Sequence, residues 1–432
     1  MASLTLVDLR ETTGALRRDD LPGVALPVEG PRALVREIVQ SVRTGGDGAL
    51  ADLTERFDGV RPRALVLGRE AMAAAYERLD RRLAEALRVA RDRVREAYEA
   101  ERPAASSLVA DGIEVRRRIV PVERAGCYVP GGQARYPSSV VHTATVARVA
   151  GVRDVVVATP PLPDGGLDDA TLAACHLAGV DTVLLAGGAQ AVAALAYGTE
   201  SLERVDVIVG PGNLFVSLAK QEVAADVGVP GAFAGPSEVV VVADGSLEPR
   251  VAAIDVAVQA EHGPHGLAWL VTWDARWAEQ VLEELAAYVE ASPRRAQLES
   301  TLEAHGYLAL VRDRDQARLV ADAIAPEHLE LLYDQAVRDA DRVRHAGVVF
   351  VGRAASAAFG DYVAGPSHVL PTAGTARFAS VLGLEDFQRR LHVVEVHDEA
   401  LSRLGWAVEA LADAEGLVAH ADSIRIRREA GW

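Results

Sequence analysis

Half of the 432 residues are apolar, so the chain can bury sizeable cores in about two or three domains. Lys and Arg number 45 against 62 Asp and Glu, which gives a formal charge of −17. A surface this acidic repels phosphate backbones and anionic lipid, so we expect no nucleic-acid partner and no membrane partner.

The cysteines and the apolar runs bear on redox chemistry and location. Cys127 and Cys175 stand far apart, outside any CxxC pattern, and two cysteines exclude both a disulfide framework and a thiolate zinc site. The first residues, MASLTLVDLRETTG, lack a basic segment followed by an apolar core, so we expect no secretory signal. Because no apolar run reaches the roughly 18 to 20 residues of a membrane helix, we expect a soluble, cytoplasmic protein.

The first hundred residues predict helices. One helical face collects Val35, Ile38, Val39 and Val42, and the glycines of GGDG at 45–48 then break the chain before a second helix. A long charged helix is expected over 69–101, with an apolar stripe that we interpret as packing against a domain body rather than as a cofactor site. A turn at Asp111-Gly112 predicts a hairpin between strands at 107–110 and 113–122.

From about residue 130, short apolar strands alternate with helices. Strands are expected at 154–158, 181–186, 205–209, 238–243, 267–273, 307–311 and 347–351. Helices are expected between them, at 140–150, 167–178, 188–198, 213–226 and 249–262, with a further segment at 275–292. Continuous Val, Leu and Ile runs separated by helices predict parallel sheets covered on both faces. The residues from about 383 predict a separate, mostly helical tail.

Gln259 and His262 close a predicted helix just before Gly263-Pro264. They are three residues apart, so both side chains project from one helical face, as two ligands of a metal site do. A pair of histidines at this spacing would be more specific. The alternative is a C-terminal histidine that interacts with the helix dipole.

Two further segments carry residues suited to proton transfer and metal binding. Glu327 and His328 are adjacent, with Pro326 near the start of a predicted short helix, and an acid beside a histidine can share proton transfers near neutral pH. The alternative is an ordinary acidic residue in a first helical turn. Asp361 and His368 lie on a loop rich in turn formers, and Asp361 offers a zinc or other divalent ion an oxygen ligand, although it could also only initiate a turn.

Glycine-rich breaks follow several of the predicted strands. They are YVPGG at 128–132, AGGAQ at 186–190 and GPGN at 210–213. A strand, glycines and a helix N-terminus hold phosphates and dinucleotides in α/β proteins. No segment is a GxGxxG motif, and each alone could be a tight crossover. At successive strand ends, however, they predict one ligand-binding crevice.

Taken together, these segments resemble the histidinol dehydrogenase family nearly from end to end. The segments that occur in the family's order and spacing are VRTGGDGALADLTERFDGV, CYVPGG, YPSSV, GGAQAVAALAYGTESLERVDVIVGPGN, AGPSE, QAEHGP, APEHLEL, GDYVAGPSHVLPT and EGLVAH. The chain departs from the family's pattern at 141–145, where His142 stands in a run that is usually Met-Asn-Ala-Ile-Pro-like. It also departs before His368, where Pro-Ser replaces Thr-Asn or Ser-Asn, and at His265. We interpret His142 as structural and His265 as a surface residue.

The resemblance implies an α/β fold of two incomplete Rossmann-like parallel-sheet domains, with small terminal segments exchanged in a homodimer. We expect an N-terminal segment over 1–24 and a Rossmann-like NAD-binding domain over 131–236. The α/β domain with the zinc and catalytic residues is expected over 25–130 with 237–382. A small helical domain over 383–432 is expected to complete the partner's site.

The resemblance also implies the roles of individual residues. One zinc ion per subunit is held by Gln259, His262, Asp361 and His420, and Glu327 and His328 do the proton work. The substrate is contacted by Ser237, His368 and Glu415 together with His328 and the zinc ligands. NAD+ is contacted by Tyr128, Gln190 and Asn213.

The implied activity is the four-electron oxidation of L-histidinol to L-histidine through the aldehyde, with two NAD+, at the end of histidine biosynthesis. One alternative is a paralogue that oxidises another small polar alcohol, such as a sulfonated diol. The presence of Glu415, His420 and His368 favours histidinol over this alternative. A non-catalytic zinc or nucleotide-binding module is another, but it would not need the pair of Glu327 and His328. NADH formation with histidinol separates the three hypotheses.

Overall fold

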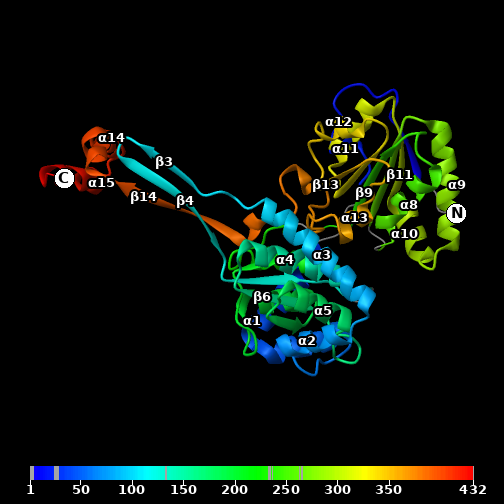
Figure 1. Ribbon diagram of the computed structural model, residues 1–432, viewed down its shortest axis with the longest axis horizontal. Coiled ribbons are helices and arrows are strands. Elements are labelled where there is room, and N and C mark those ends of the chain that lie inside the picture. The colour runs from blue at the N-terminus through cyan, green and yellow to red at the C-terminus, as the bar shows by residue number, and fades with distance from the viewer. Residues whose placement is uncertain are drawn as a thin grey trace.

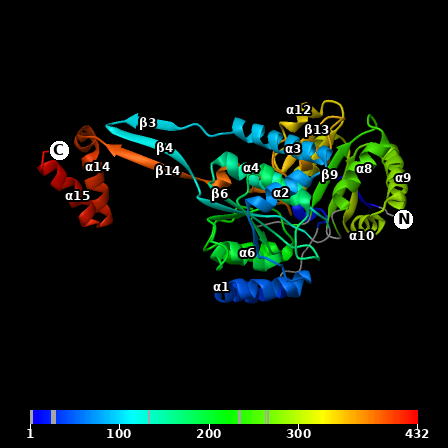
Figure 2. The ribbon, with the colours of Figure 1, turned by 60° about the horizontal axis from the view of Figure 1, so that its bottom comes forward.

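The computed structural model describes residues 4–23, 29–131, 134–231, 235, 237–261, 263 and 266–431. These residues form two α/β units, each built on a mainly parallel sheet, and an arm that projects from them (Figure 1). The second view shows the same arrangement, with the arm extending well beyond both units (Figure 2). The expected α/β class with parallel sheets is therefore confirmed.

The five-stranded sheet has the order β2-β7-β6-β5-β8. The short β2 runs antiparallel at one edge, and the other strands run parallel to one another. The strands are β2 (Val66–Leu67), β5 (Arg124–Tyr128), β6 (Asp154–Thr159), β7 (Thr182–Leu185) and β8 (Val207–Val209). Along β6, Val155 and Val157 point into one core while Val156 and Ala158 point into the other, so both faces of this sheet are buried.

Helices cover both faces of the five-stranded sheet. One core is formed with α2 (Arg69–Arg78), α3 (Arg81–Ala100), α4 (Pro137–Ala150) and α5 (Asp169–Ala178). The other core is formed with α1 (Glu29–Asp58), α6 (Gly188–Tyr197) and α7 (Leu214–Val223). Helices α1 to α3 thus pack on the sheet that we expected from 131–236, and β2 and β5 are strands of it, whereas the expected boundaries grouped 25–130 with 237–382.

Local sequence explains two features of the N-terminal helices. The break expected at 45–48 is a kink inside α1, where Gly46 adopts a φ of 55°. The single helix expected over 69–101 is wrong, because it ends at Leu79 and restarts as α3. Asp80 causes the restart, since its carboxylate accepts hydrogen bonds from the amides of Arg82 and Leu83 and so caps α3.

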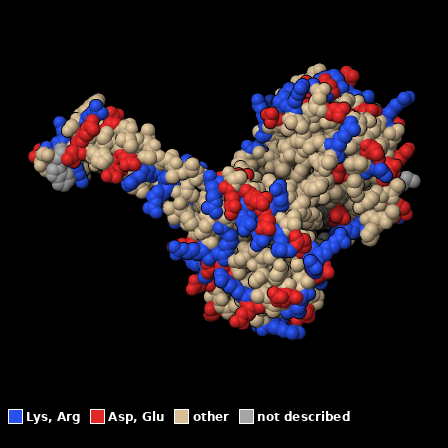
Figure 3. All heavy atoms as spheres, in the orientation of Figure 1, with Lys and Arg blue, Asp and Glu red and all other residues tan. Residues whose placement is uncertain are grey.

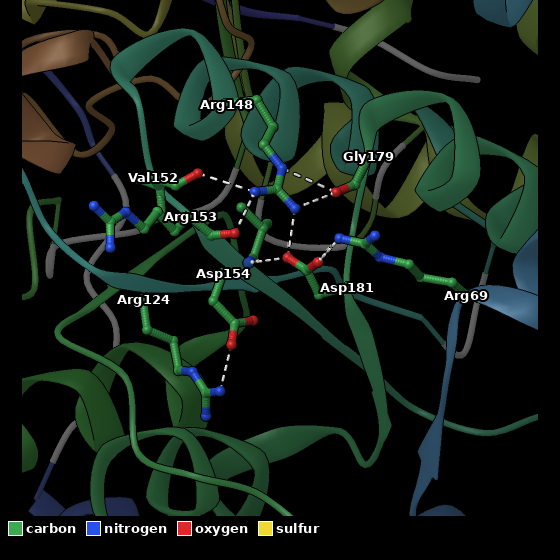
Figure 4. Close-up of polar contacts among 9 residues, drawn as sticks. Arg69, Arg124, Arg148, Val152, Arg153, Asp154, Gly179 and Asp181 are labelled. Atoms are coloured by element: carbon green, nitrogen blue, oxygen red, sulfur yellow. Dashed lines mark hydrogen bonds and ion pairs between the residues drawn. The ribbon is translucent and has the colours of Figure 1, made fainter.

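A network of hydrogen bonds and ion pairs around Arg148 lies at the amino edge of the five-stranded sheet (Figure 4). Arg148 donates to the carbonyl oxygens of Val152 and Gly179, both at 2.9 Å, and to the carboxylate of Asp181. Asp181 also accepts from the Val155 amide at 2.8 Å and pairs with Arg69. Burial alone would raise the pKa of Asp181, but these hydrogen bonds and charges lower it. The network therefore ties the C-terminal ends of α4 and α5 to β6 and β7.

The six-stranded sheet has the order β1-β11-β10-β9-β12-β13, with all neighbouring strands parallel. The strands are β1 (Thr5–Asp8), β9 (Glu238–Ala243), β10 (Leu267–Thr272), β11 (Gly306–Leu310), β12 (His328–Leu332) and β13 (Val348–Val351). One face is covered by α8 (Pro249–Ala260), α9 (Ala275–Ala291) and α10 (Arg295–His305). The other is covered by α11 (Arg314–Ile324) and α12 (Ala336–Ala340), while α13 (Ala357–Tyr362) contacts α8 and β12.

Strand β12 corrects an expectation. The segment after Pro326 was predicted as a short helix, but His328–Leu332 is a central strand that pairs with β9 and β13. The alternation explains the outcome, because Leu329 and Leu331 pack toward α11 while His328 and Glu330 lie on the opposite face. Pairing with two neighbours outweighs the local preference that proline suggested.

The arm is a three-stranded antiparallel ribbon with two helices at its far end (Figures 1 and 2). Its elements are β3 (Ser106–Ala110), β4 (Ile113–Pro121), β14 (Gln388–Val396), α14 (Asp398–Glu415) and α15 (Val418–Glu429). The expected hairpin is present, and the tail expected to be mostly helical contains α14 and α15 but also supplies the strand β14. At the base, Phe387 is fully buried and its carbonyl accepts from the Val122 amide at 2.9 Å. Within the described ranges, no helix is long and apolar enough to cross a membrane.

Candidate active site

Glu327 and His328 lie where β12 begins, beside the first residue of β9. The Glu238 amide donates to the Glu327 carboxylate at 2.8 Å, and the Glu327 amide donates back to the Glu238 carboxylate at 3.3 Å. The Ala373 amide donates to the other Glu238 oxygen at 2.9 Å. The pKa of Glu238 is raised to about 8, mainly by burial and secondly by the charge of Glu327. The two strand starts are therefore joined by a buried pair of carboxyl groups.

The main chain of Glu238 also sets the tautomer of His328. Nδ1 of His328 is 2.9 Å from the Glu238 carbonyl oxygen, which can only accept, so Nδ1 carries a proton. Nε2 is 3.6 Å from the Asp361 carboxylate and has no hydrogen bond in the described part of the chain. Burial lowers the pKa of His328, but the carboxylates of Glu327 and Asp361 outweigh it and raise the pKa well above its ordinary value. His328 thus presents Nε2 as its reactive nitrogen.

Gln259 and Asp361 meet at the same place, although they are 102 residues apart. The Gln259 amide nitrogen donates to Asp361 at 3.1 Å. Gln259 ends α8, and Asp361 lies in the short helix α13 rather than in the expected loop. His262 lies outside the described residues. The residues Gln259, His328, Glu327 and Asp361 therefore form one cluster at the amino edge of the six-stranded sheet, a cluster that we call the acid–histidine cluster.

His368 joins the acid–histidine cluster to the other unit. Its Nδ1 donates to the Asp361 carbonyl at 2.9 Å, and its Nε2 is 3.1 Å from the Ser139 hydroxyl in α4. The ring stacks on His142, also in α4, with centroids 4.4 Å apart. Burial lowers the pKa of His142 to about 3, so that ring is neutral, and burial also lowers the pKa of His368. The contact brings the start of α4 against the segment that carries Asp361.

The residues expected to contact NAD+ lie at the carboxyl edge of the five-stranded sheet. The Tyr128 hydroxyl, at the end of β5, accepts from the Gly188 amide at 3.0 Å where α6 begins. Gln190, in the first turn of α6, is buried, and its side-chain nitrogen has no partner among the described residues. The Asn213 side chain accepts from the Val216 amide at 3.1 Å and caps α7.

At this edge two stretches of backbone approach each other so closely that a glycine is required. Gly210 has a φ of 106°, and a Cβ there would lie 2.1 Å from the Tyr128 carbonyl oxygen. The N-termini of α6 and α7 open at the same edge, and unpaired amides at helix N-termini suit a pyrophosphate. An orphaned amide, a tyrosine hydroxyl and two helix starts therefore fit a dinucleotide.

Two expected site residues are far from the acid–histidine cluster of their own chain. Glu415 ends α14 and His420 lies in α15, both at the tip of the arm. Figure 1 shows that tip remote from both sheets. Ser237 directly precedes β9, and its carbonyl accepts from the Leu267 amide at 2.9 Å.

The donor chemistry of the expected zinc ligands can be tested on this geometry. Amide, carboxylate and imidazole groups are ligands that zinc accepts, and Gln259 and Asp361 already touch each other. Among the described residues, no group of three His, Cys, Asp or Glu side chains forms a metal site. One expected ligand, His262, lies outside them and another, His420, is at the arm tip. The residues in place fit zinc but supply only part of a four-ligand set.

A cavity of about 630 Å³ elsewhere does not serve this chemistry. It lies against α11, and none of the candidate residues lines it. Its arginines are Arg318, Arg342, Arg344 and Arg377. Arg318 pairs with Asp322 at 2.9 Å and Arg342 with Asp315 at 2.8 Å. Much of the positive charge there is thus compensated within the chain.

The two sheets and their facing edges define a two-unit α/β enzyme that combines acid–base groups with a dinucleotide-type crevice. The family model of histidinol dehydrogenase matches residues 27–428. The chain belongs to the histidinol dehydrogenase family.

Individual relatives agree with this assignment. The chain is 44% identical over 391 residues to histidinol dehydrogenase of Parasynechococcus marenigrum, covering 90% of this chain and 89% of that protein. It is 45% identical over 397 residues to the enzyme of Pseudomonas aeruginosa, covering 91% and 90%. The crystal structure of histidinol dehydrogenase from Elizabethkingia anophelis superimposes with a TM-score of 0.93 at 28% identity, covering 99% of this chain and 98% of that one.

Glu238 was not singled out from the sequence. The available signal was an acidic residue at the head of a strand that is otherwise valine and alanine. Its role rests on main-chain bonds to Glu327 and His328, which no residue pattern announces.

Proposed function

We propose that this protein oxidises L-histidinol to L-histidine in two NAD+-dependent steps, at a zinc site completed by a second copy of the chain. Family membership over residues 27–428 supports the substrate and an NAD-linked oxidoreductase of histidine biosynthesis. The observation that carries the proposal is the contact of Ser139 with His368, at 3.1 Å. It brings α4, which follows the strand of Tyr128, against the segment of Asp361. The dinucleotide crevice therefore lies beside the acid–histidine cluster, as hydride transfer requires.

The zinc ligands in this proposal are Gln259, His262, Asp361 and His420 of the partner subunit. Zinc, when bound, would orient the imidazole and amine of histidinol and take up the charge of Asp361. The residues Ser237, His368 and Glu415 are proposed to contact the substrate. Glu415, like His420, would act from the partner's arm.

Proton transfers are assigned to two adjacent residues. Zinc bound to Asp361 would counter the negative charge that raises the pKa of His328, so that His328, held by Nδ1 on the Glu238 carbonyl, could take the hydroxyl proton on Nε2 while the hydride leaves the alcohol carbon for NAD+. Glu327 takes a proton from the water that adds to the aldehyde. The second hydride then leaves the hydrated carbon for a second NAD+, which yields the carboxylate. Tyr128, Gln190 and Asn213 would hold the dinucleotide at the facing edge, and the dinucleotide would supply the hydride acceptor.

The homodimer is proposed from the arm. The arm exposes a set of large apolar side chains. Its surface shows uncharged stretches between the charged groups (Figure 3). These side chains are Leu108, Val109, Leu391, Val394, Val396, Trp406, Leu411, Val418 and Ile426. Apolar surface of this extent marks an interaction site, and exchange of identical elements is a low-cost route to a twofold dimer.

The yield of NADH tests the function. Each histidinol consumed should give two NADH with no free aldehyde accumulating, because one site carries out both oxidations. A yield of one NADH per histidinol would contradict the four-electron reaction. No NADH from histidinol, but NADH from a sulfonated diol, would assign the chain to a paralogous activity.

A further inference from the structure

Behind the acid–histidine cluster lies a buried pair of carboxyl groups that the proposed mechanism does not use. Asp255, in α8, is 3% exposed and Glu330, in β12, is fully buried. The two carboxyl groups lie close enough to each other that each affects the pKa of the other. In the described part of the chain, neither is paired with Lys or Arg.

Each carboxyl group uses one oxygen for a fixed donor. The Ser356 hydroxyl donates to Asp255 Oδ1 at 3.0 Å, and the Ala357 amide donates to Glu330 Oε1 at 2.6 Å. The remaining oxygens, Oδ2 and Oε2, are buried and have no hydrogen-bond partner among the described residues. Two acceptors can bond to each other only if one carries a proton, so a single proton shared between the two groups would satisfy both oxygens. Burial accordingly raises the pKa of Asp255 to about 6 and of Glu330 to about 8.

The elements joined by this proton are those that carry the acid–histidine cluster. Asp255 lies one helical turn before Gln259 in α8. Glu330 lies two residues after His328, on the same face of β12. Ala357 begins α13, one turn before Asp361.

We propose that Asp255 and Glu330 are a positioning pair, whose shared proton holds α8, β12 and α13 so that Gln259, His328 and Asp361 converge. This inference rests on the proposed zinc site and reaction. The proposal predicts that, of the two side-chain atoms that face each other, one must be a hydrogen-bond donor and the other an acceptor. It also predicts that the net charge of the pair matters less.

Amide substitutions test that requirement. In Asp255→Asn, the amide nitrogen faces the Glu330 carboxylate and replaces the shared proton; in Glu330→Gln, it faces Asp255. Each single variant should bind zinc and turn over histidinol within about threefold of wild type. In Asp255→Leu, a side chain of similar shape offers neither a donor nor an acceptor, so the inner oxygen of Glu330 is left buried without a partner. Zinc affinity and kcat should then fall by about 10- to 100-fold, as for other partners behind metal ligands, with KM changed less.

Zinc affinity is measured on metal-free protein by competition with a chromogenic chelator, and kcat and KM are measured on the zinc-loaded enzyme. Asp386→Asn is the control, because Asp386 is a half-buried carboxyl group whose pKa is also raised to about 6 but which lies outside these elements. It should change neither quantity. An Asp255→Leu variant that behaves like wild type, or amide variants as impaired as Asp255→Leu, would overturn the proposal. Failure of wild-type protein to oxidise histidinol would instead contradict the function, while the zinc measurement would still test the pair.

Discussion

The two α/β units and the arm use apolar residues in opposite ways. In β9 every residue is buried, and valines fill four successive positions of a strand covered on both faces. In β3 every residue is exposed, although its hydrogen bonds to β4 are complete. The helices at the tip, α14 and α15, bury only small residues such as Ala400 and Ala412 against each other or the ribbon. Each unit buries its apolar side chains in a hydrophobic core. The described part of the arm has no such core, so its apolar side chains remain exposed.

The difference separates the candidate site into two parts. Gln259, Glu327, His328 and Asp361 are placed by the packing of one unit. Glu415 and His420 are instead carried by the arm, whose large apolar side chains remain exposed in the described part of the chain. In the proposed dimer, a partner would cover the apolar side chains of the arm and receive Glu415 and His420. The experiments below test this division of the site, from the largest expected effect to the smallest.

Mixing two inactive variants tests the division directly. His262→Ala and His420→Ala should each lose most bound zinc and nearly all activity. When the two are unfolded and refolded together, half of the dimers are mixed, and each contains one site with both ligands intact. About a quarter of wild-type activity should therefore return. If His420 serves its own chain, every site keeps one lesion and the mixture stays inactive.

The proton-transfer residues should have effects confined to chemistry. His328→Asn should slow hydride transfer from the alcohol, because the base is gone, and Glu327→Gln should impair aldehyde oxidation more, because water is no longer activated. Losses of about 10²–10⁴-fold are expected in single-turnover rates for each step. Near wild-type rates on both steps in both variants would make the pair structural.

A charge placed on the arm should have a smaller effect, and one that depends on protein concentration. Leu411, 66% exposed on α14, would be buried by a partner, so Leu411→Lys should shift dimers to monomers. Sedimentation velocity measures the shift, and activity should recover as the protein concentration is raised. Val337→Lys is the control, because Val337 is 72% exposed on α12 of the unit. Unchanged dimerisation of Leu411→Lys would exclude this face of the arm from the interface.

The smallest expected effect is on the pH dependence of stability in the six-stranded unit. The folded-state pKa of Glu330 is raised to about 8, so the folded protein holds a proton that the unfolded chain releases near pH 4.5. The resulting stability is present below pH 4.5 and is lost as the pH rises through about 8. Hydrogen exchange in metal-free protein should show β12 losing protection from pH 6 to 8.5, less steeply in Glu330→Gln. Protection of β12 that does not respond to the substitution would contradict the assignment.

Sequence predicted much of the fold and one part of the site. Valine-rich runs predicted the parallel strands well, because burial on both faces leaves a local signature. The same reasoning misplaced His328–Leu332, where Pro326 suggested a helix and pairing with β9 decided the outcome. The acid–histidine cluster was expected only through family resemblance. The roles of Glu238, Asp255 and Glu330 could not be predicted, because they depend on contacts between residues 75 or more positions apart that leave no local pattern.

The length of the arm has a mechanical consequence. Strand β4 has nine residues and spans about 30 Å, at roughly 3.3 Å per residue. A tilt of only 5° about the base would move its far end by roughly 2.6 Å, although metal ligands must be placed within about 0.5 Å. Anchoring at the base thus cannot by itself hold the tip precisely enough to deliver a ligand. In the proposed dimer, the surface of the other subunit on which the tip docks would therefore have to fix the position of the tip, as the far support of a lever does.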